Sequence, residues 1–151
     1  MKITTRCFGE ARTVEVPQNQ IVDFPTGLVG FEQWQRFALI EVPDTPIKWL
    51  QCLEEEGLSL PVMEPFLLVA EYDFEIPDAD VRLLRLARPE DAQVLVVLTI
   101  REELQQVTAN LMAPIVINRP ARRGRQLVLQ SGQYPLRYPV FQGKTTVSAA
   151  A

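Results

Sequence analysis

Short stretches of β-forming residues, separated by proline or glycine, recur along most of the chain and are the strongest constraint on its fold. The 151 residues include 12 prolines and 7 glycines. Proline lacks an N–H and is tolerated in sheets only at edges, at bulges or at the first residue of a strand, so the strands must be short. We predict extended segments at residues 2–8, 10–16, 21–24, 36–42, 47–53, 58–63, 93–100, 114–118 and 126–130. This pattern is typical of a mainly β, small single-domain β-barrel-like fold with short connections.

Residues 78–88 form the one segment with clear helical periodicity. Val81, Leu84 and Ala87 recur at three-residue spacing, and Pro89 ends the segment. Asp78 is placed as the N-cap, and Asp80 lies in the first turn, where a carboxylate interacts favourably with the helix dipole. Residues 32–35 and 102–106 have room for a single helical turn each. The fold should therefore contain one or two short helices.

Residues 25–32 (PTGLVGFE) contain two glycines that allow a positive φ or a close backbone approach. A phosphate-binding loop would need GxGxxG or GxxxxGK[ST], and neither motif is present. We predict a tight loop that closes over the core, with Phe24, Leu28 and Phe31 as its apolar anchors.

The composition argues against an enzyme. The chain has no histidine, so the commonest general base and metal ligand is missing, and no serine lies in a GxSxG motif. We predict no cofactor and no metal. Cys7 and Cys52 could form a disulfide in a secreted protein, but we favour two buried thiols. The net charge of −4 repels nucleic-acid phosphate, so direct nucleic-acid binding is not expected.

The N-terminal residues MKITTRCFGE lack the apolar core of a signal peptide. No apolar run reaches the ~20 residues that a membrane-spanning helix needs. We therefore expect a cytoplasmic protein that does not enter a membrane.

Glu71, Asp73 and Glu75 alternate along residues 64–76, so in a strand all three carboxylates would project from one face. Such a row could bind a metal or take part in acid–base chemistry. We favour a solvent-facing acidic edge, which maintains solubility or meets a basic partner. Tyr72 and Phe74, which lie between the carboxylates, would then face the core.

A basic connection at residues 119–125 (RPARRGR) carries the only cluster of arginines: Arg119, Arg122, Arg123 and Arg125. We predict a turn at Gly124, after which residues 126–130 (QLVLQ) pair back on residues 114–118. Arginines on such a loop could grip phosphate, so a small nucleic-acid or small-molecule binding barrel is the alternative function.

Residues 108–118 (TANLMAPIVIN) carry no charge and are interrupted by Pro114, which should begin a short strand. Asn110 and Asn118 are placed to cap turns. We expect Leu111, Ile115 and Ile117 to be buried, and Asn110, Met112 and Pro114 to lie at or beside a partner surface.

Three ordered motifs carry a resemblance to a known family: FPTGLVGFE at residues 24–32, PFLLVAEYDFEIPD at 65–78, and TANLMAPIVIN at 108–118. QLVLQSGQYPLRYPV follows at residues 126–140. The chain resembles the bacterial flagellar assembly factor FliW family. The resemblance implies a β-barrel domain over residues 1–140; residues 144–151 match nothing, and residues 141–151 are expected to form a flexible C-terminal tail.

The resemblance also implies a function without enzymatic activity. Members of this family bind flagellin and CsrA, a basic RNA-binding repressor of flagellin translation, in the cytoplasm. Flagellin that accumulates occupies the FliW-type protein, which releases CsrA to shut down flagellin translation. From the residues themselves we add a candidate partner-binding set, in which the carboxylates place negative charge near the RNA path of CsrA. The set is Glu71, Asp73, Glu75, Asn110, Met112, Pro114 and Asn118.

Overall fold

The computed structural model describes residues 1–7, 9–101, 106–130 and 132–141. The predicted turn at residues 102–106 and the predicted tail lie outside these ranges, apart from residues 106 and 141.

Seven strands close into a barrel, as the proline-punctuated sequence predicts. The neighbour order is β7-β6-β5-β4-β3-β10-β9, and pairing of β7 with β9 closes the ring. All neighbours are antiparallel except β3 and β10, which are parallel. The strands are β3 (Ile21–Asp23), β4 (Arg36–Glu41), β5 (Lys48–Cys52), β6 (Ser59–Met63), β7 (Ala92–Thr99), β9 (Ile115–Asn118) and β10 (Arg123–Gln126).

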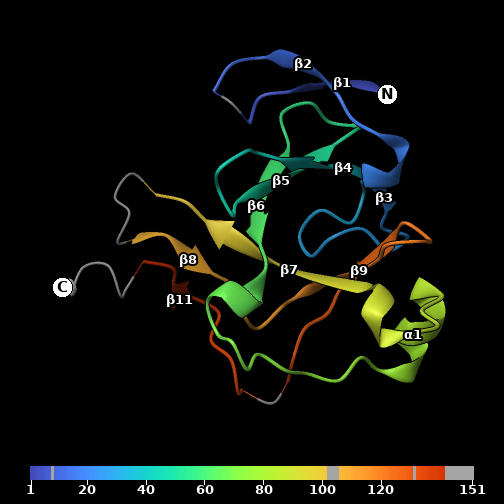
Figure 1. Ribbon diagram of the computed structural model, residues 1–151, viewed down its shortest axis with the longest axis vertical. Helices are drawn as coiled ribbons and strands as arrows, with labels where there is room; N and C mark the ends of the chain where they lie inside the picture. Colours follow the sequence, from blue (N-terminus) through green and yellow to red (C-terminus); the bar gives the residue numbers. More distant parts are fainter. Residues whose placement is uncertain (8, 102–105, 131, 142–151) are drawn as a thin grey trace.

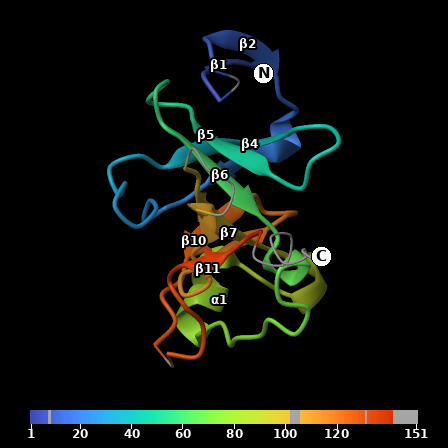
Figure 2. The ribbon, with the colours of Figure 1, turned by 90° about the vertical axis from the view of Figure 1, so that its left-hand side faces the viewer.

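Smaller elements surround the barrel. The hairpin of β1 (Lys2–Thr5) and β2 (Arg12–Glu15) lies at one end of the molecule, and the helix α1 (Asp78–Leu84) lies at the other (Figures 1 and 2). β8 (Thr108–Ala109) pairs with the end of β7, and β11 (Tyr138–Pro139) pairs with β8. The short 3-10 helices η1 (Gln18–Gln20), η2 (Pro65–Leu67) and η3 (Pro89–Asp91) lie between strands.

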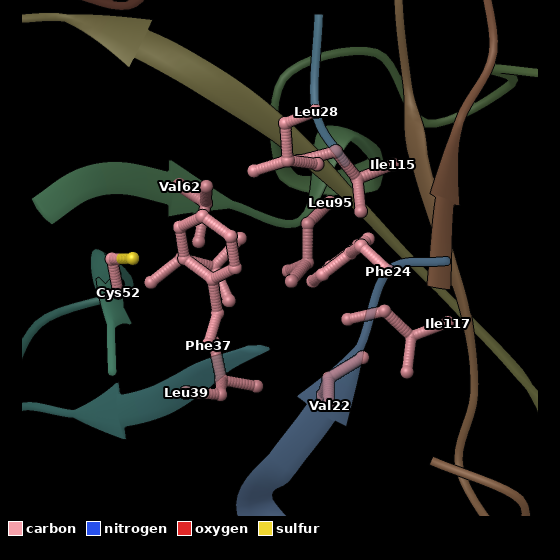
Figure 3. Close-up of a cluster of buried hydrophobic side chains, with 11 residues drawn as sticks. Val22, Phe24, Leu28, Phe37, Leu39, Cys52, Val62, Leu95, Ile115 and Ile117 are labelled. Atoms are coloured by element: carbon pink, nitrogen blue, oxygen red, sulfur yellow. The ribbon is translucent and has the colours of Figure 1, made fainter. Parts of the chain in front are cut away.

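The core fills the barrel with alternate side chains of its strands, which point toward one another in Figure 3. Phe24 and Leu28 come from the loop that follows β3, and both are fully buried among the strand residues. The rings of Phe24 and Phe37 meet edge to face, with centroids 5.6 Å apart. Gly27 and Gly30 have positive φ angles of 72° and 87°. The predicted loop with Phe24 and Leu28 as core anchors is therefore confirmed, and Phe31 packs against the core partly buried.

The helix prediction needs two corrections. Pro77 is the N-cap and Asp78 is the first helical residue, so Asp78 does not cap the helix as predicted. The helix ends at Leu84, well before Pro89, because Arg85 adopts a left-handed conformation with φ 58°. The side-chain amide of Asn118, on β9, donates to the carbonyl oxygens of Leu84 and Arg85 at 2.9 Å each. A strand residue distant in sequence thus satisfies the helix C-terminus, which local periodicity could not predict.

The cysteines are both free thiols, but the prediction that both are buried is right only for Cys52, since Cys7 is partly exposed. Cys52 is buried in the barrel core, and this burial raises the pKa of its thiol, although the backbone N–H groups of Glu54 and Glu55 counteract the rise. The thiol therefore stays protonated and packs as a small apolar group.

Candidate functional site

Segments that are far apart in the sequence meet beside the barrel: residues 66–76, 110–114, 127–130 and 132–135. The phenol of Tyr72 donates a hydrogen bond to the Leu111 carbonyl oxygen at 2.6 Å. The backbone N–H of Leu111 donates to the Pro135 carbonyl at 3.1 Å, and that of Asp73 donates to the Tyr134 hydroxyl at 2.9 Å. The motifs at residues 65–78 and 108–118 therefore lie together in one surface.

The carboxylates Glu71, Asp73 and Glu75 lie on this surface and are exposed, while Tyr72 between them is buried. The predicted alternation is confirmed, but the predicted strand is wrong, since residues 71–77 belong to no strand. The Asp73 N–H bonds to a tyrosine side chain instead of a neighbouring strand. The described residues contain no group of three or more metal-ligating side chains suited to a metal ion.

Aromatic side chains surround Tyr72 and add an apolar area next to the carboxylates. The ring of Tyr72 lies 4.5 Å from that of Tyr134, 5.5 Å from Phe74 and 6.1 Å from Phe66, measured between centroids. Burial and, secondarily, the neighbouring Tyr134 raise the pKa of the Tyr72 phenol far above its ordinary value. Phe66 and Leu67 on η2 remain 47% and 61% exposed. Sequence reasoning missed these two residues, although an apolar pair directly after Pro65 was the available signal.

Asn110 shapes the turn that carries Met112. Its side-chain oxygen accepts hydrogen bonds from the N–H groups of Met112 and Ala113, at 3.0 and 3.1 Å. Met112 is half-buried, whereas Leu111, Ile115 and Ile117 are buried as predicted. Pro114 is buried, and Asn118 is only 3% exposed. Asn110 and Asn118 thus cap turns as predicted, since Asn118 also accepts from the Ala121 N–H at 3.4 Å.

Residues 127–130 do not form the predicted strand, although they run alongside residues 112–114. The N–H groups of Leu127 and Leu129 donate to the carbonyls of Pro114 and Met112, both at 2.8 Å. The return bonds of an antiparallel ladder cannot form, because Pro114 has no N–H and the Met112 N–H bonds to Asn110. The strand that pairs with β9 is instead β10, which includes Arg123, Gly124 and Arg125.

The predicted basic turn is therefore right only in part: Arg119 and Arg122 are exposed in a turn at residues 119–122, whereas Arg123 and Arg125 lie in β10. Arg123 donates to the Leu83 carbonyl at 2.8 Å, and Arg125 pairs with Asp80 and donates to the Thr26 hydroxyl at 2.8 Å. Arg119 donates to the Glu90 carbonyl at 3.4 Å. Because these bonds hold the strands to α1 and to the neighbouring loops, they disfavour the alternative of a phosphate-gripping loop.

A groove of about 630 Å³ lies beside residues 126–130, and we call it the edge groove. Val29 and Val128 flank it and are 55% and 52% exposed. The side-chain amide of Gln126 accepts a hydrogen bond from the Val29 N–H at 2.9 Å and donates one to the Ala113 carbonyl at 3.0 Å, which holds residues 26–29 against residues 126–130. The groove is lined by residues 26–29, Glu32, Glu75, Pro77, Asp80 and residues 125–130.

The edge groove continues into a smaller hollow of about 310 Å³ that is also lined by Asp73. Glu75, Leu129 and Gln130 border both hollows. Of the predicted carboxylates, Glu75 therefore lines the edge groove and Asp73 lines the adjoining hollow, while the Met112 carbonyl accepts a hydrogen bond from the Leu129 N–H. Val29, Gln126 and Val128 were missed, because only tertiary structure brings residues 26–32 against residues 126–130.

A family model described as "FliW protein" matches residues 2–140 of this chain. The chain belongs to the FliW family. The flagellar assembly factor FliW of Thermosipho africanus is 37% identical over 144 residues, covering 94% of this chain and 97% of its own. That of Caldicellulosiruptor saccharolyticus is 34% identical over 140 residues, covering 93% and 90%.

A solved structure agrees with this assignment. The crystal structure of a flagellar assembly factor FliW superimposes with a TM-score of 0.83 at 30% identity, covering 93% of this chain and 96% of that one. The mainly β barrel and the FliW resemblance predicted from the sequence are both confirmed. Among the described residues, no helix has the length and apolarity that crossing a membrane requires.

Proposed function

We propose that this FliW-family protein is a cytoplasmic, non-enzymatic regulator of flagellar assembly that sequesters the translational repressor CsrA and is titrated by flagellin. Free flagellin would occupy the protein, release CsrA and so stop further flagellin translation. The single observation that carries the proposal is membership of a family named for flagellar assembly, over residues 2–140.

The surface around Tyr72 supports a role in binding proteins. It combines exposed carboxylates with the exposed apolar residues Phe66 and Leu67. Acidic groups beside apolar anchors suit a basic protein partner, because opposite charges speed association while apolar burial supplies affinity. The net charge of −4 acts in the same direction, since a bound acidic protein repels RNA from a nearby RNA-binding site.

The candidate residues divide by burial. We propose that Glu71, Asp73, Glu75, Asn110 and Met112 contact a partner directly, since their side chains are exposed or half-buried. For Pro114 and Asn118, which are buried, we propose a contribution through the backbone that they hold in place. The two partners could then use the same face or different faces of the barrel.

The test is direct binding of the purified protein to CsrA and, separately, to flagellin, followed by addition of flagellin to the CsrA complex. We expect both complexes at micromolar concentration and displacement of CsrA by flagellin. Absence of both complexes would refute the proposal.

Met112→Glu should weaken binding at least tenfold and leave the melting temperature within a few degrees, because Met112 is only half-buried. Met112→Leu keeps the apolar contact and should bind normally. Thr4→Glu, on the exposed face of β1, adds the same charge at the other end of the molecule and serves as the charge control. Unfolding of Met112→Glu would place Met112 in the core rather than at the partner surface.

A further inference from the structure

Residues 126–130 expose one edge of their backbone. The N–H groups of Leu127 and Leu129 point toward residues 112–114, where they are bonded. Successive residues of an extended chain direct their N–H groups to opposite sides, so those of Val128 and Gln130 point the other way. Within the part of the chain that the structure describes, neither of these two N–H groups has a hydrogen-bond partner.

The edge is open because its neighbour in the barrel ends early. β10 pairs with β3 only at Arg123 and Asp23. After β3 the chain turns away at Phe24, whose N–H donates to the Gln35 carbonyl. The edge groove is the space that a longer β3 would have occupied.

The walls of the groove indicate the chemistry of an occupant. Glu32, Glu75 and Asp80 line it, while Arg125, which pairs with Asp80, is the one cation among its lining residues. Val29 and Val128 offer exposed apolar contacts on either side. The unpaired N–H groups of Val128 and Gln130 are two residues apart, a spacing that matches the carbonyl groups on one side of an extended peptide. A compact small molecule would not satisfy donors at that spacing.

We propose that the edge groove captures an extended segment of a protein partner, which adds as a strand to residues 126–130. Its carbonyls accept from the N–H groups of Val128 and Gln130, its lysine or arginine side chains face Glu32 and Glu75, and its β-branched side chains cover Val29 and Val128. The inference rests on the proposed function in that it assumes a protein as the natural occupant, and it adds the mode of recognition.

The probe is an acetylated, amidated eight-residue peptide of alternating valine and lysine, added to the full chain. Hydrogen exchange monitored by NMR should show the amides of Val128 and Gln130 slowing at least fivefold at saturating peptide, with those of Leu127 and Leu129 little changed. The same peptide N-methylated at its central valines keeps its side chains but cannot pair, and it should give no protection. Protection by both peptides, or by neither, would overturn the proposal.

Val128→Pro tests the edge in the protein itself. It removes one outward N–H and leaves both inward bonds intact, so peptide affinity should fall about fivefold, the equivalent of one backbone hydrogen bond. Val128→Thr retains the N–H and a β-branched side chain, and it should bind as the wild type does. If Val128→Pro fails to fold, Gln130→Pro removes the second outward donor at an exposed position.

The outcomes separate this inference from the proposed function. Binding of CsrA or flagellin that Val128→Pro and Gln130→Pro leave unchanged, without protection by the peptide, would refute strand addition and leave the proposed function standing. Protection of the Val128 and Gln130 amides by the peptide, without binding of CsrA or flagellin, would support strand addition and refute the proposed function. Dimerisation of the chain that both proline variants abolish would show a second copy as the occupant and overturn the proposal.

Discussion

Replacing Asn118 with alanine should lower the free energy of unfolding, because the Asn118 side chain on β9 satisfies the carbonyl groups at the C-terminus of α1. The Asn118 amide donates at 2.9 Å to the carbonyls of Leu84 and Arg85, which end α1, and its oxygen accepts from Ala121. The bond to Leu84 is buried, and the bond to Arg85 is partly buried.

The magnitude follows from what each carbonyl does after the change. The buried Leu84 carbonyl would lose its partner, which costs about 1–3 kcal/mol, while the Arg85 carbonyl can regain water at a cost of about 0.5–1 kcal/mol. We therefore expect the free energy of unfolding to fall by about 1.5–4 kcal/mol. For a domain of this size, the melting temperature should fall by about 5–15 °C.

The assay is urea and thermal unfolding followed by circular dichroism. Asn19→Ala is the matched control, because Asn19 is an exposed asparagine on η1 and should change stability by at most about 0.5 kcal/mol. Asn118→Asp preserves size but replaces the donor with a carboxylate facing two carbonyls, so it should be no more stable than the alanine variant. A melting temperature for Asn118→Ala within ~1 °C of the wild type would refute this account of the helix end.

Two further predictions concern the core and the Tyr72 surface. Gly124→Ala should lower the free energy of unfolding by about 1–3 kcal/mol, since a Cβ would overlap the buried Phe24 ring. Gly57→Ala, whose Cβ would meet only a flexible carboxylate, should be near neutral in the same denaturation experiment, and equal effects would contradict the packing argument. Burial raises the pKa of Tyr72, so its phenol stays protonated in the folded protein while the unfolded chain ionises near pH 10. Stability should therefore be complete below pH 10 and fall above it by up to about 1.4 kcal/mol per pH unit, a slope that Tyr72→Phe should reduce in denaturation curves.

Much of the architecture could be predicted from the sequence, because periodicity and proline placement act locally. The strands that became β3 to β7 and β9 follow from alternation and turn residues, and the anchoring roles of Phe24 and Leu28 follow from the glycines beside them. The ordered motifs likewise pointed to the FliW family, which the comparisons confirm.

Errors arose where a specific hydrogen bond, either from a neighbouring side chain or from a residue distant in sequence, fixed the backbone. The early end of α1 depends on Asn118, and the failed ladder at residues 127–130 depends on Asn110 occupying the Met112 N–H. The arginines were placed in a turn, but bonds to Leu83, Asp80 and Thr26 hold two of them in β10. Each local pattern had more than one solution, and these hydrogen bonds selected among them.

By itself the sequence determined which segments are extended, which residues are apolar enough to fill a barrel, and which family the chain resembles. Only the tertiary structure decided that β3 stops short beside β10, leaving residues 126–130 with an open edge in a groove that Glu32 and Glu75 also line. The physical reason is that burial preference is a property of each side chain, whereas an unpaired backbone edge exists only relative to the strand that fails to cover it.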